Sequence, residues 1–212
     1  MVSVIITAYN YDRYIERAIR SCMDQSLNED EYEIIVVNDC STDNTDKILE
    51  NYKNDVRVFN LEKNSGLSAA RNFGVRKALG QFIIFIDADD YIQHDLLFVQ
   101  KTFLSENNAL DAISTDYFLV DERGNHLEHV NAEKKPIACG IMFRKDLLID
   151  IGLYDESFHA REEEELRIRF LKKHNIYNII LPLYRYRMHE DNLTKNKSKM
   201  DKYKNKLLKK HG

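Results

Sequence analysis

Short apolar segments alternate with amphipathic segments through the first half of the chain, and this alternation restricts the fold more than any other feature. Phe82–Ile86 is a run of five large apolar residues, which is typical of a strand buried on both faces. Regular strand–helix alternation predicts βαβ units, a mostly parallel sheet and helices on both of its faces. The expected strands are Val2–Ala8, Glu33–Asn38, Val56–Asn60 and Phe82–Ile86, and the expected helices are Tyr11–Gln25, Thr42–Tyr52 and Ser65–Leu79.

The second half is less regular and predicts a smaller region of mixed structure. We expect a turn at Asp121–Asn125, followed by another extended stretch, and one or two strands over Tyr177–Met188, interrupted at Pro182. The sequence therefore predicts one α/β domain over residues 1–194, with a nucleotide-binding half (about 1–110) and a more variable half (about 111–194). A tail (195–212) follows this domain. Further strands are expected over Asp111–Val120 and Ala138–Phe143, and a helix over Glu162–His174.

Charge and cysteine content exclude several classes of protein. The net charge is −4, yet Lys195–Gly212 holds eight lysines and one acid, so the preceding body is strongly acidic and we expect no nucleic-acid partner. Cys22, Cys40 and Cys139 lie far apart, without metal-ligand spacing, and are interpreted as free thiols in a reducing compartment. The sequence contains no apolar run of membrane-spanning length, and Met1 leads directly into a strand. We therefore expect a cytoplasmic protein.

Carboxylates follow the apolar strand Phe82–Ile86 directly, in the order Asp87-Ala88-Asp89-Asp90. Three neighbouring aspartates repel one another and are costly to bury, and a hard divalent cation with oxygen ligands relieves that repulsion. Ligands of open α/β sheets bind beyond the carboxyl ends of the strands, which is where this cluster lies. Taken alone, the cluster fits a turn or a helix cap equally well.

Two other strand ends carry polar residues. After the first strand, Tyr9 offers a ring on which a flat ligand can stack, and backbone amides are exposed beside it. After the second, Asp39 can accept a hydrogen bond from a base or a ribose hydroxyl. Capping of the next helix explains Thr42 and Asp43 well, but we do not expect it to explain Asp39.

Three further segments contain candidate site residues, each with an ordinary structural alternative. Gly66 allows close backbone approach, and Arg71 could reach an anion, although taken alone it is more often a surface helical arginine. The run Glu162–Glu165 is typical of a solvated helix start, but a carboxylate crowded by like charges also suits a general base. His189 ends a strand, where it is usually structural but could complete a metal shell.

Taken together and in this order, these segments resemble family 2 glycosyltransferases with the GT-A fold. The resemblance covers residues 2 to about 190, and its motifs are specific as a set because five occur in register. The residues that carry it are Ser3–Asn10, Ile35–Asp43, Asn64–Gly66, Ala70–Asn72, Asp87–Asp90, Asp155–Phe158, Glu162-Glu163 and Glu165-Leu166.

The resemblance implies a role for each matching position. Asp39 would bind the base, typically uracil, Asp87 the ribose or sugar, and Asp89 would bind Mn²⁺ or Mg²⁺ at the diphosphate. Glu163 would be the general base, with His189 as a further metal ligand. The residues expected to bind the nucleotide-sugar donor are Thr7, Ala8, Tyr9, Asp39, Asn64, Gly66, Arg71, Asp87, Ala88 and Asp89.

The sequence departs from the family pattern at two places. Asn38-Asp39-Cys40-Ser41 stands where Asp-Asp-Gly-Ser is commoner, which keeps Asp39 but is expected to alter the turn. The usual Glu-Asp pair is Glu162-Glu163 here, so the base would be one methylene longer. We favour Glu163 over Glu162 as the base.

The implied activity is an inverting, metal-dependent transfer of a sugar from a nucleoside-diphosphate sugar, with UDP as the expected nucleotide. The acceptor would be a hydroxyl of a glycan or a lipid-linked glycan, in cell-surface polysaccharide or glycoconjugate synthesis. A non-catalytic nucleotide-sugar or carbohydrate binder is the alternative. A sugar nucleotidyltransferase ranks lower because Thr7–Tyr14 contains no glycine.

The lysine-rich tail is expected to be solvated and partly helical. Met200, Tyr203 and Leu207 would share one helical face, so a basic amphipathic helix could rest on an anionic membrane surface. This would place the protein at the inner face of the membrane.

Overall fold

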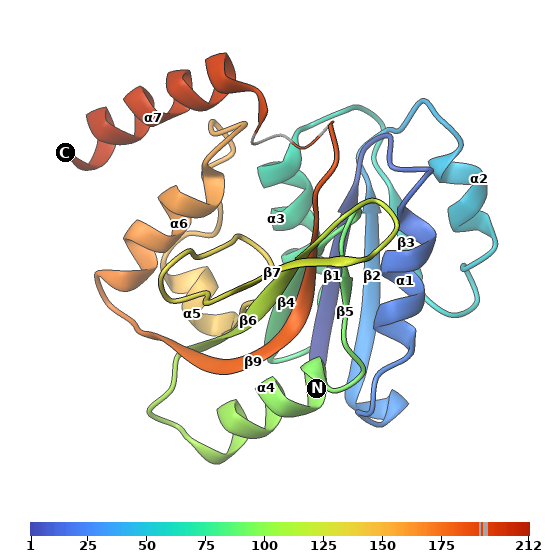
Figure 1. The fold of residues 1–212 in the computed structure, drawn as a ribbon, viewed down its shortest axis with the longest axis horizontal. Helices are drawn as coiled ribbons and strands as arrows, with labels where there is room; N and C mark the ends of the chain where they lie inside the picture. Colours follow the sequence, from blue (N-terminus) through green and yellow to red (C-terminus); the bar gives the residue numbers. More distant parts are fainter. Residues whose placement is uncertain (191, 193–194) are drawn as a thin grey trace.

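A curled sheet with helices packed around it forms the body of the molecule (Figure 1). The structure is a computed structural model that describes residues 1–190, 192 and 195–212. The strands are β1 (Val2–Ala8), β2 (Tyr32–Asn38), β3 (Arg57–Asn60), β4 (Phe82–Asp87), β5 (Tyr91–Ile92), β6 (Ala112–Val120), β7 (His126–Val130), β8 (Met142–Arg144) and β9 (Ile176–Arg187). The helices are α1 (Ile15–Met23), the 3₁₀ turn η1 (Glu29–Glu31), α2 (Thr45–Glu50), α3 (Leu67–Lys77), α4 (Leu96–Glu106), α5 (Lys145–Asp150), α6 (Glu162–Leu171) and α7 (Lys197–His211).

The order of the strands separates a parallel half from a mixed half. Along the sheet the order is β3-β2-β1-β4-β8-β6-β9-β5, and β7 pairs with β6. β1 runs parallel to both β2 and β4, whereas β8 is antiparallel to β4 and to β6. The predicted α/β class, with a parallel first half and a smaller mixed region, is therefore confirmed.

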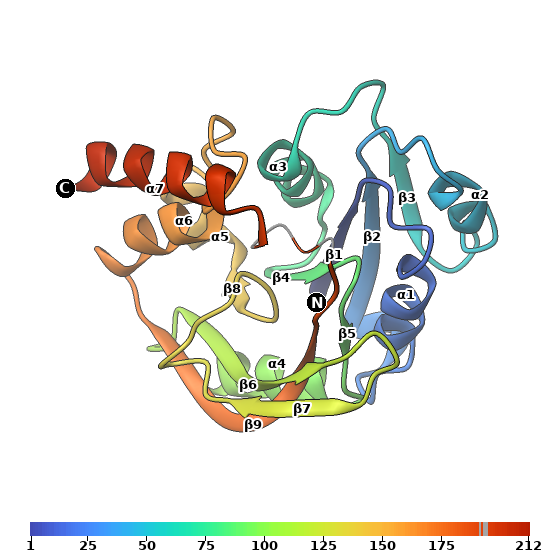
Figure 2. The ribbon, with the colours of Figure 1, turned by 45° about the horizontal axis from the view of Figure 1, so that its top comes forward.

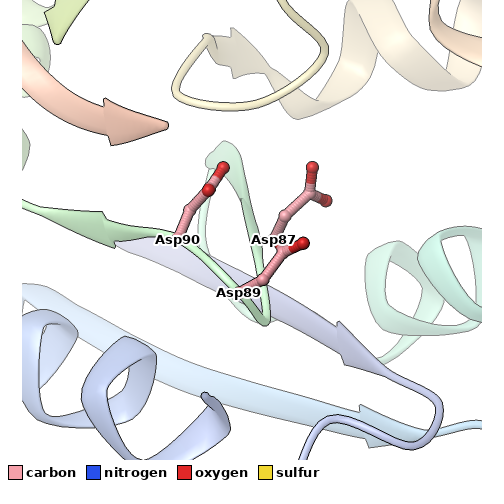
Figure 3. Close-up of side chains that lie close together, drawn as sticks. All are labelled: Asp87, Asp89 and Asp90. Atoms are coloured by element: carbon pink, nitrogen blue, oxygen red, sulfur yellow. The ribbon is translucent and has the colours of Figure 1, made fainter. Parts of the chain in front are cut away.

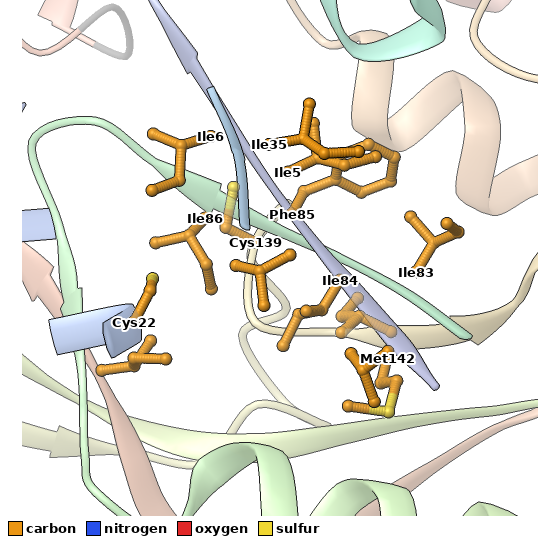
Figure 4. Close-up of a cluster of buried hydrophobic side chains, with 14 of the residues drawn as sticks. Ile5, Ile6, Cys22, Ile35, Ile83, Ile84, Phe85, Ile86, Cys139 and Met142 are labelled. Carbon is orange, nitrogen blue, oxygen red and sulfur yellow. The ribbon is translucent and has the colours of Figure 1, made fainter. Parts of the chain in front are cut away.

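Helices cover both faces of the parallel half because its strands are apolar on both sides. All seven residues of β1 are buried. In both ribbon views α1 lies on one side of β1 and β2, and α3 lies on the other (Figures 1 and 2). α3 sits very close to the sheet, since a Cβ atom on Gly74 would come within 2.5 Å of Ile5 Cγ2. The core between these layers is dominated by isoleucine (Figure 4).

Several predicted boundaries were too wide. The first helix begins at Ile15 rather than Tyr11, because the Tyr11 amide donates to Thr45 Oγ1 instead of entering a helix. α2 begins at Thr45 rather than Thr42, since the Asp43 carboxylate accepts from the Thr45 amide and holds the preceding loop. The expected strand over Ala138–Phe143 is confined to Met142–Arg144; Gly140, with φ of 74°, interrupts the extended backbone before it.

The other predicted elements of the second half are confirmed, except that the strand interruption expected at Pro182 is absent. The turn at Asp121–Asn125 closes through a hydrogen bond from the Asp121 amide to the Asn125 carbonyl and leads into β7. β9 continues past Pro182 as one strand, with a shift in its register against β6 at Asp116. The strand β5 and the helices α4 and α5 were not predicted. α4 was missed although its buried residues Leu96, Leu97, Gln100 and Leu104 share one face.

The tail forms a helix that packs on the body instead of extending into solvent. Tyr203 and Leu207 of α7 are buried against Phe158 and Ala160. Lys210 Nζ lies 2.7 Å from carboxylate oxygens of both Asp155 and Glu165 (the tail segment is red in Figure 1). The face that we expected to meet a membrane therefore faces the domain.

Two remaining expectations concern the thiols and the membrane. Cys22, Cys40 and Cys139 are free, as predicted. Across the described parts of the chain, each helix is too short or too polar to cross a lipid bilayer.

Candidate functional site

The candidate site lies at the carboxyl ends of β1 and β4. β2 and β3 extend the sheet on one side of β1, and β4 extends it on the other, so the strand order reverses here. Open α/β sheets bind ligands in the crevice at such a reversal. Thr7 of β1 lies directly opposite Asp87 of β4 in this register, so the polar ends of both strands meet.

Three aspartates extend from the turn that follows β4 (Figure 3). Asp87, Asp89 and Asp90 each offer a carboxylate oxygen, and these oxygens lie within 4.8 Å of one another. Asp90 is committed to the fold, because its carboxylate accepts from the Tyr184 hydroxyl at 2.7 Å and from the Arg187 amide at 2.8 Å. These contacts fix β9 against the turn and leave Asp87 and Asp89 as the carboxylates that line a cavity.

Asp89 is paired with the predicted metal ligand His189. His189 Nε2 lies 2.8 Å from Asp89 Oδ2, and the His189 ring stacks on Tyr14 with ring centroids 4.9 Å apart. The other ring nitrogen, Nδ1, is buried without a hydrogen-bond partner among the described residues. Burial raises the pKa of Asp89, and the charge of Asp87 adds to this, whereas the His189 hydrogen bond opposes it.

This set of donors fits a divalent cation. Carboxylates that are buried close together repel each other and have raised proton affinity, and a cation removes that cost. Burial and the charges of Asp89 and Asp87 also raise the pKa of Asp90. Carboxylate oxygens with a nearby imidazole suit Mn²⁺ or Mg²⁺ by their chemistry.

Arg71 is buried in the site, which rules out the alternative that it is a surface helical arginine. Its Nη2 donates to Asp87 Oδ1 at 2.9 Å and its Nη1 donates to Glu162 Oε1 at 3.0 Å. The guanidinium lies near the rings of Phe85 and Tyr154. Arg71 therefore joins the end of β4 to the start of α6 and compensates two carboxylates.

The glutamates that begin α6 include buried, paired residues and residues that line a cavity, and Glu162 is both. Glu162 and Glu165 are buried, and Glu165 pairs with Arg169 at 2.6 Å. The interpretation of this run as a solvated helix start is therefore wrong for these two. Glu163 points elsewhere and lines a cavity. Burial, together with the charge of Glu162, raises the pKa of Glu163 to about 7.

Asp87, Asp89 and Glu163 line the same cavity, which has a volume of about 300 Å³ and is called the acidic cavity below. The carboxylates come from two distant segments, the turn after β4 and the start of α6. His189 lies behind Asp89, outside the lining. The other predicted residues in the lining are Thr7, Arg71, Ala88 and Glu162.

A second cavity of about 410 Å³ adjoins the first and is called the Asp39 cavity below. The two cavities share Thr7, Tyr11 and Leu67 in their linings. Six residues predicted to bind the donor line the Asp39 cavity: Thr7, Ala8, Tyr9, Asp39, Asn64 and Gly66.

Asp39 has a structural role that the sequence analysis did not predict. Its Oδ1 accepts from the Ser65 amide at 2.7 Å and its Oδ2 accepts from the Gly66 amide at 2.8 Å. The carboxylate thus holds the loop that leads into α3, and it does not cap the helix α2 that follows it in the chain. A carboxylate oxygen has two lone pairs, so Asp39 can still accept from a ligand in the cavity that it lines.

Cys40 keeps the turn that a glycine would make. We expected its presence to alter this turn, but it adopts a φ of 62°, in the left-handed region that glycine favours. The Cys40 thiol donates weakly to the Glu62 carbonyl at 3.7 Å.

Sequence reasoning missed several residues of the two linings. Tyr11 and Leu67 lie close in sequence to residues that were predicted to bind the donor. That proximity could have indicated that they belong to the site. Lys199 and Met200 come from α7, which was assigned to solvent. The only sequence feature that pointed to a contact of this helix was the apolar face shared by Met200, Tyr203 and Leu207. It predicted an apolar contact but not the part of the molecule that makes it.

The sequence matches a known protein family and several of its members. The family model described as glycosyl transferase family 2 matches residues 3–210. An uncharacterized glycosyltransferase of Rickettsia bellii is 31% identical over 206 residues, which are 91% of this chain and 29% of that protein. The poly(ribitol-phosphate) β-N-acetylglucosaminyltransferase TarS of Staphylococcus aureus is 39% identical over 110 residues, which are 50% of this chain and 19% of TarS. The chain therefore spans less than a third of these relatives.

Solved structures show the same fold. S. aureus TarS 1-349 in complex with UDP-GlcNAc aligns with a TM-score of 0.78 and 27% identity, covering 92% of this chain and 60% of that one. The mannosyltransferase of Pyrobaculum calidifontis in complex with GDP-Man and Mn²⁺ aligns with a TM-score of 0.77 over 99% of this chain and 63% of its own, at 17% identity. These matches confirm the predicted GT-A fold.

Proposed function

The chain belongs to glycosyl transferase family 2, and we propose that it transfers a sugar from a nucleoside-diphosphate sugar, with UDP as the nucleotide, to a hydroxyl group of an acceptor. The observation that carries this proposal is the acidic cavity, which Asp89 and Glu163 line together. Such a transfer needs a carboxylate that can hold a cation and a separate carboxylate that can accept a proton.

The Asp39 cavity is proposed to hold the nucleoside. Tyr9 is 43% exposed, which leaves its ring available to stack on a base, and Asp39 can accept from a base N–H. S. aureus TarS, which shares the fold at 27% identity, has been solved in complex with UDP-GlcNAc. Because the Asp39 cavity adjoins the acidic cavity, a diphosphate attached to this nucleoside would reach Asp87 and Asp89.

Asp89 and His189 are proposed to hold Mn²⁺ or Mg²⁺, with Asp87 directed to the ribose or sugar. When bound, the cation would supply Lewis-acid stabilisation of the charge on the leaving diphosphate. Asp90 would keep the turn in place through Tyr184 and the Arg187 amide.

Glu163 is proposed to remove the proton from the acceptor hydroxyl as that oxygen attacks the anomeric carbon. A pKa of about 7 suits this role, because about half of the carboxylate is ionised near neutral pH and the ionised form is a stronger base than an ordinary glutamate. Glu162 is paired with Arg71 and is less available for proton transfer. Direct attack by the acceptor inverts the anomeric centre.

The acceptor is proposed to be a glycan or a lipid-linked glycan of the cell surface. The relatives include a putative teichuronic acid biosynthesis glycosyltransferase and a minor teichoic acid biosynthesis protein, both of Bacillus subtilis. Residues 1–194 are proposed to form the catalytic domain, on which α7 packs. Because the apolar face of α7 is buried, peripheral contact with the inner face of the membrane is proposed only through its exposed lysines, and vesicle co-sedimentation tests it.

An assay for transfer or hydrolysis of a panel of nucleotide sugars, with Mn²⁺ and with EDTA, tests the proposed function. We expect turnover of at least one UDP-sugar that requires the metal. Binding of UDP-sugars without any turnover, in the presence of candidate glycan acceptors, would instead indicate a non-catalytic binder. Turnover of a sugar phosphate with a nucleoside triphosphate would indicate a nucleotidyltransferase.

A further inference from the structure

The first turns of α7 border both cavities of the site. Lys199 lines the Asp39 cavity, and the next residue, Met200, lines the acidic cavity. The two cavities share Thr7, Tyr11 and Leu67 in their linings. A ligand that fills both cavities would therefore contact the start of α7 as well as these shared residues.

Specific contacts hold α7 in this position. The Asn196 side chain accepts from the Lys199 amide at 3.0 Å and caps the helix. Arg161 Nε donates to the Met200 carbonyl at 3.0 Å, which ties the helix to the start of α6. Further along, Tyr203 packs against Phe158, with ring centroids 5.9 Å apart. The placement of Lys199 thus follows from a docked helix rather than from a free tail.

Lys199 has no ion-pair partner among the described residues, unlike the two arginines that line the acidic cavity. Among the described residues that line them, Arg71 pairs with Asp87 and Glu162, and Arg161 pairs with Glu164 at 2.5 Å. The Lys199 ammonium forms no ion pair with any described residue. An uncompensated cation beside an acidic cavity favours a ligand that carries its own negative charge.

We propose that Lys199 binds the diphosphate of the nucleotide, so that α7 is part of the donor site. This inference rests on the proposed function, since it concerns the same donor. A nucleoside in the Asp39 cavity that directs its phosphates toward the acidic cavity would bring them to the start of α7, where Lys199 lines the first cavity and Met200 the second. His159, which also lines this cavity and approaches Gly66, completes the same wall.

Binding measurements on the full chain test this role with two ligands that differ by the diphosphate group. UDP carries the diphosphate, and uridine lacks it. Lys199→Gln is expected to weaken UDP binding about tenfold and to leave uridine binding unchanged, because one charge-assisted hydrogen bond is lost. Lys199→Arg should restore UDP affinity to within a few-fold of the wild type. Calorimetry with UDP and ligand-observed NMR with uridine, both with Mn²⁺ present, provide the values.

Lys204→Gln is the matched control, because Lys204 is exposed on the same helix and lines neither cavity. It should bind UDP as the wild type does. Equal UDP affinity in Lys199→Gln and wild type would overturn the inference, and so would an equal loss of UDP and uridine binding. A wild-type chain that binds no nucleoside diphosphate, with GDP and ADP also tried, would overturn it together with the proposed function.

Discussion

At the scale of single residues, the sequence identified the chemical groups of the site but not the contacts between them. The motif around Asp87 and Asp89 and the glutamate pair at Glu162 were identified from residue type and order, and the fold brings them into one cavity. The burial of Arg71 was not predictable, because it depends on the fold bringing Asp87 and Glu162, which are distant in sequence, to the same guanidinium. The structural bonds of Asp39 depend in the same way on a loop from another segment.

Replacement of Glu163 tests the assignment of the general base. Glu163→Gln is expected to lower the rate of transfer by about 10²–10⁴-fold, since a general base contributes about that much. In the wild type, kcat/KM should rise as the pH increases through about 7, because the carboxylate must lose its proton to act. The same rise in the variant would contradict the assignment.

The control for this variant is Glu50→Gln, which changes an exposed carboxylate on α2. Its activity and pH profile should match the wild type. Donor binding should be the same in all three proteins, because Glu163 is assigned to the acceptor hydroxyl and not to the nucleotide.

Cys40 offers a stability prediction that depends on backbone conformation alone. A left-handed conformation costs a non-glycine residue about 1–2 kcal/mol, and glycine is free of that cost. Cys40→Gly should therefore be more stable than Cys40→Ala by about 1 kcal/mol, after the greater chain entropy of glycine is allowed for. Urea unfolding of the two variants provides the comparison, and a more stable alanine variant would show that the turn relaxes.

At the scale of helices and strands, the pattern of apolar residues predicted the elements whose own sequence shows which faces are buried. The strands β1 and β4 were found because both faces are apolar, and α3 and α6 were found from their position between or after such strands. α4 was missed although its buried face is regular, and β8 was placed too early because the extended backbone starts only after Gly140. The docking of α7 was beyond prediction, since its partner Phe158 is distant in sequence.

Adjacent leucines of α7 test whether this helix is docked in solution. Leu207 is 8% exposed and packs on the body, whereas Leu208 is 58% exposed. Leu207→Ala should weaken docking by about 2 kcal/mol, and Leu208→Ala should have little effect. Trypsin cleaves after lysine, so limited proteolysis of this lysine-rich helix should be about tenfold or more faster in Leu207→Ala. Equal cleavage rates in the two variants would show that α7 does not depend on this contact.

At the scale of the whole molecule, the account depends on the fold bringing two distant acidic segments to one edge of the sheet. Strand order places Asp89 at the reversal beside β1, and Arg71 joins that turn to α6. The family could be identified from the sequence because the motifs occur in order along nearly the whole chain. The neighbouring arrangement of the two cavities could not, because it requires the loop before α6 and the start of α7 to be in place.

A crystal structure of the chain with Mn²⁺ and UDP, with diffraction data collected at the manganese absorption edge, tests this most directly. The account predicts an anomalous peak beside Asp89, in the cavity that Glu163 also lines, with the uracil in the Asp39 cavity. Manganese bound elsewhere, or UDP bound with its phosphates directed away from Asp89, would contradict it.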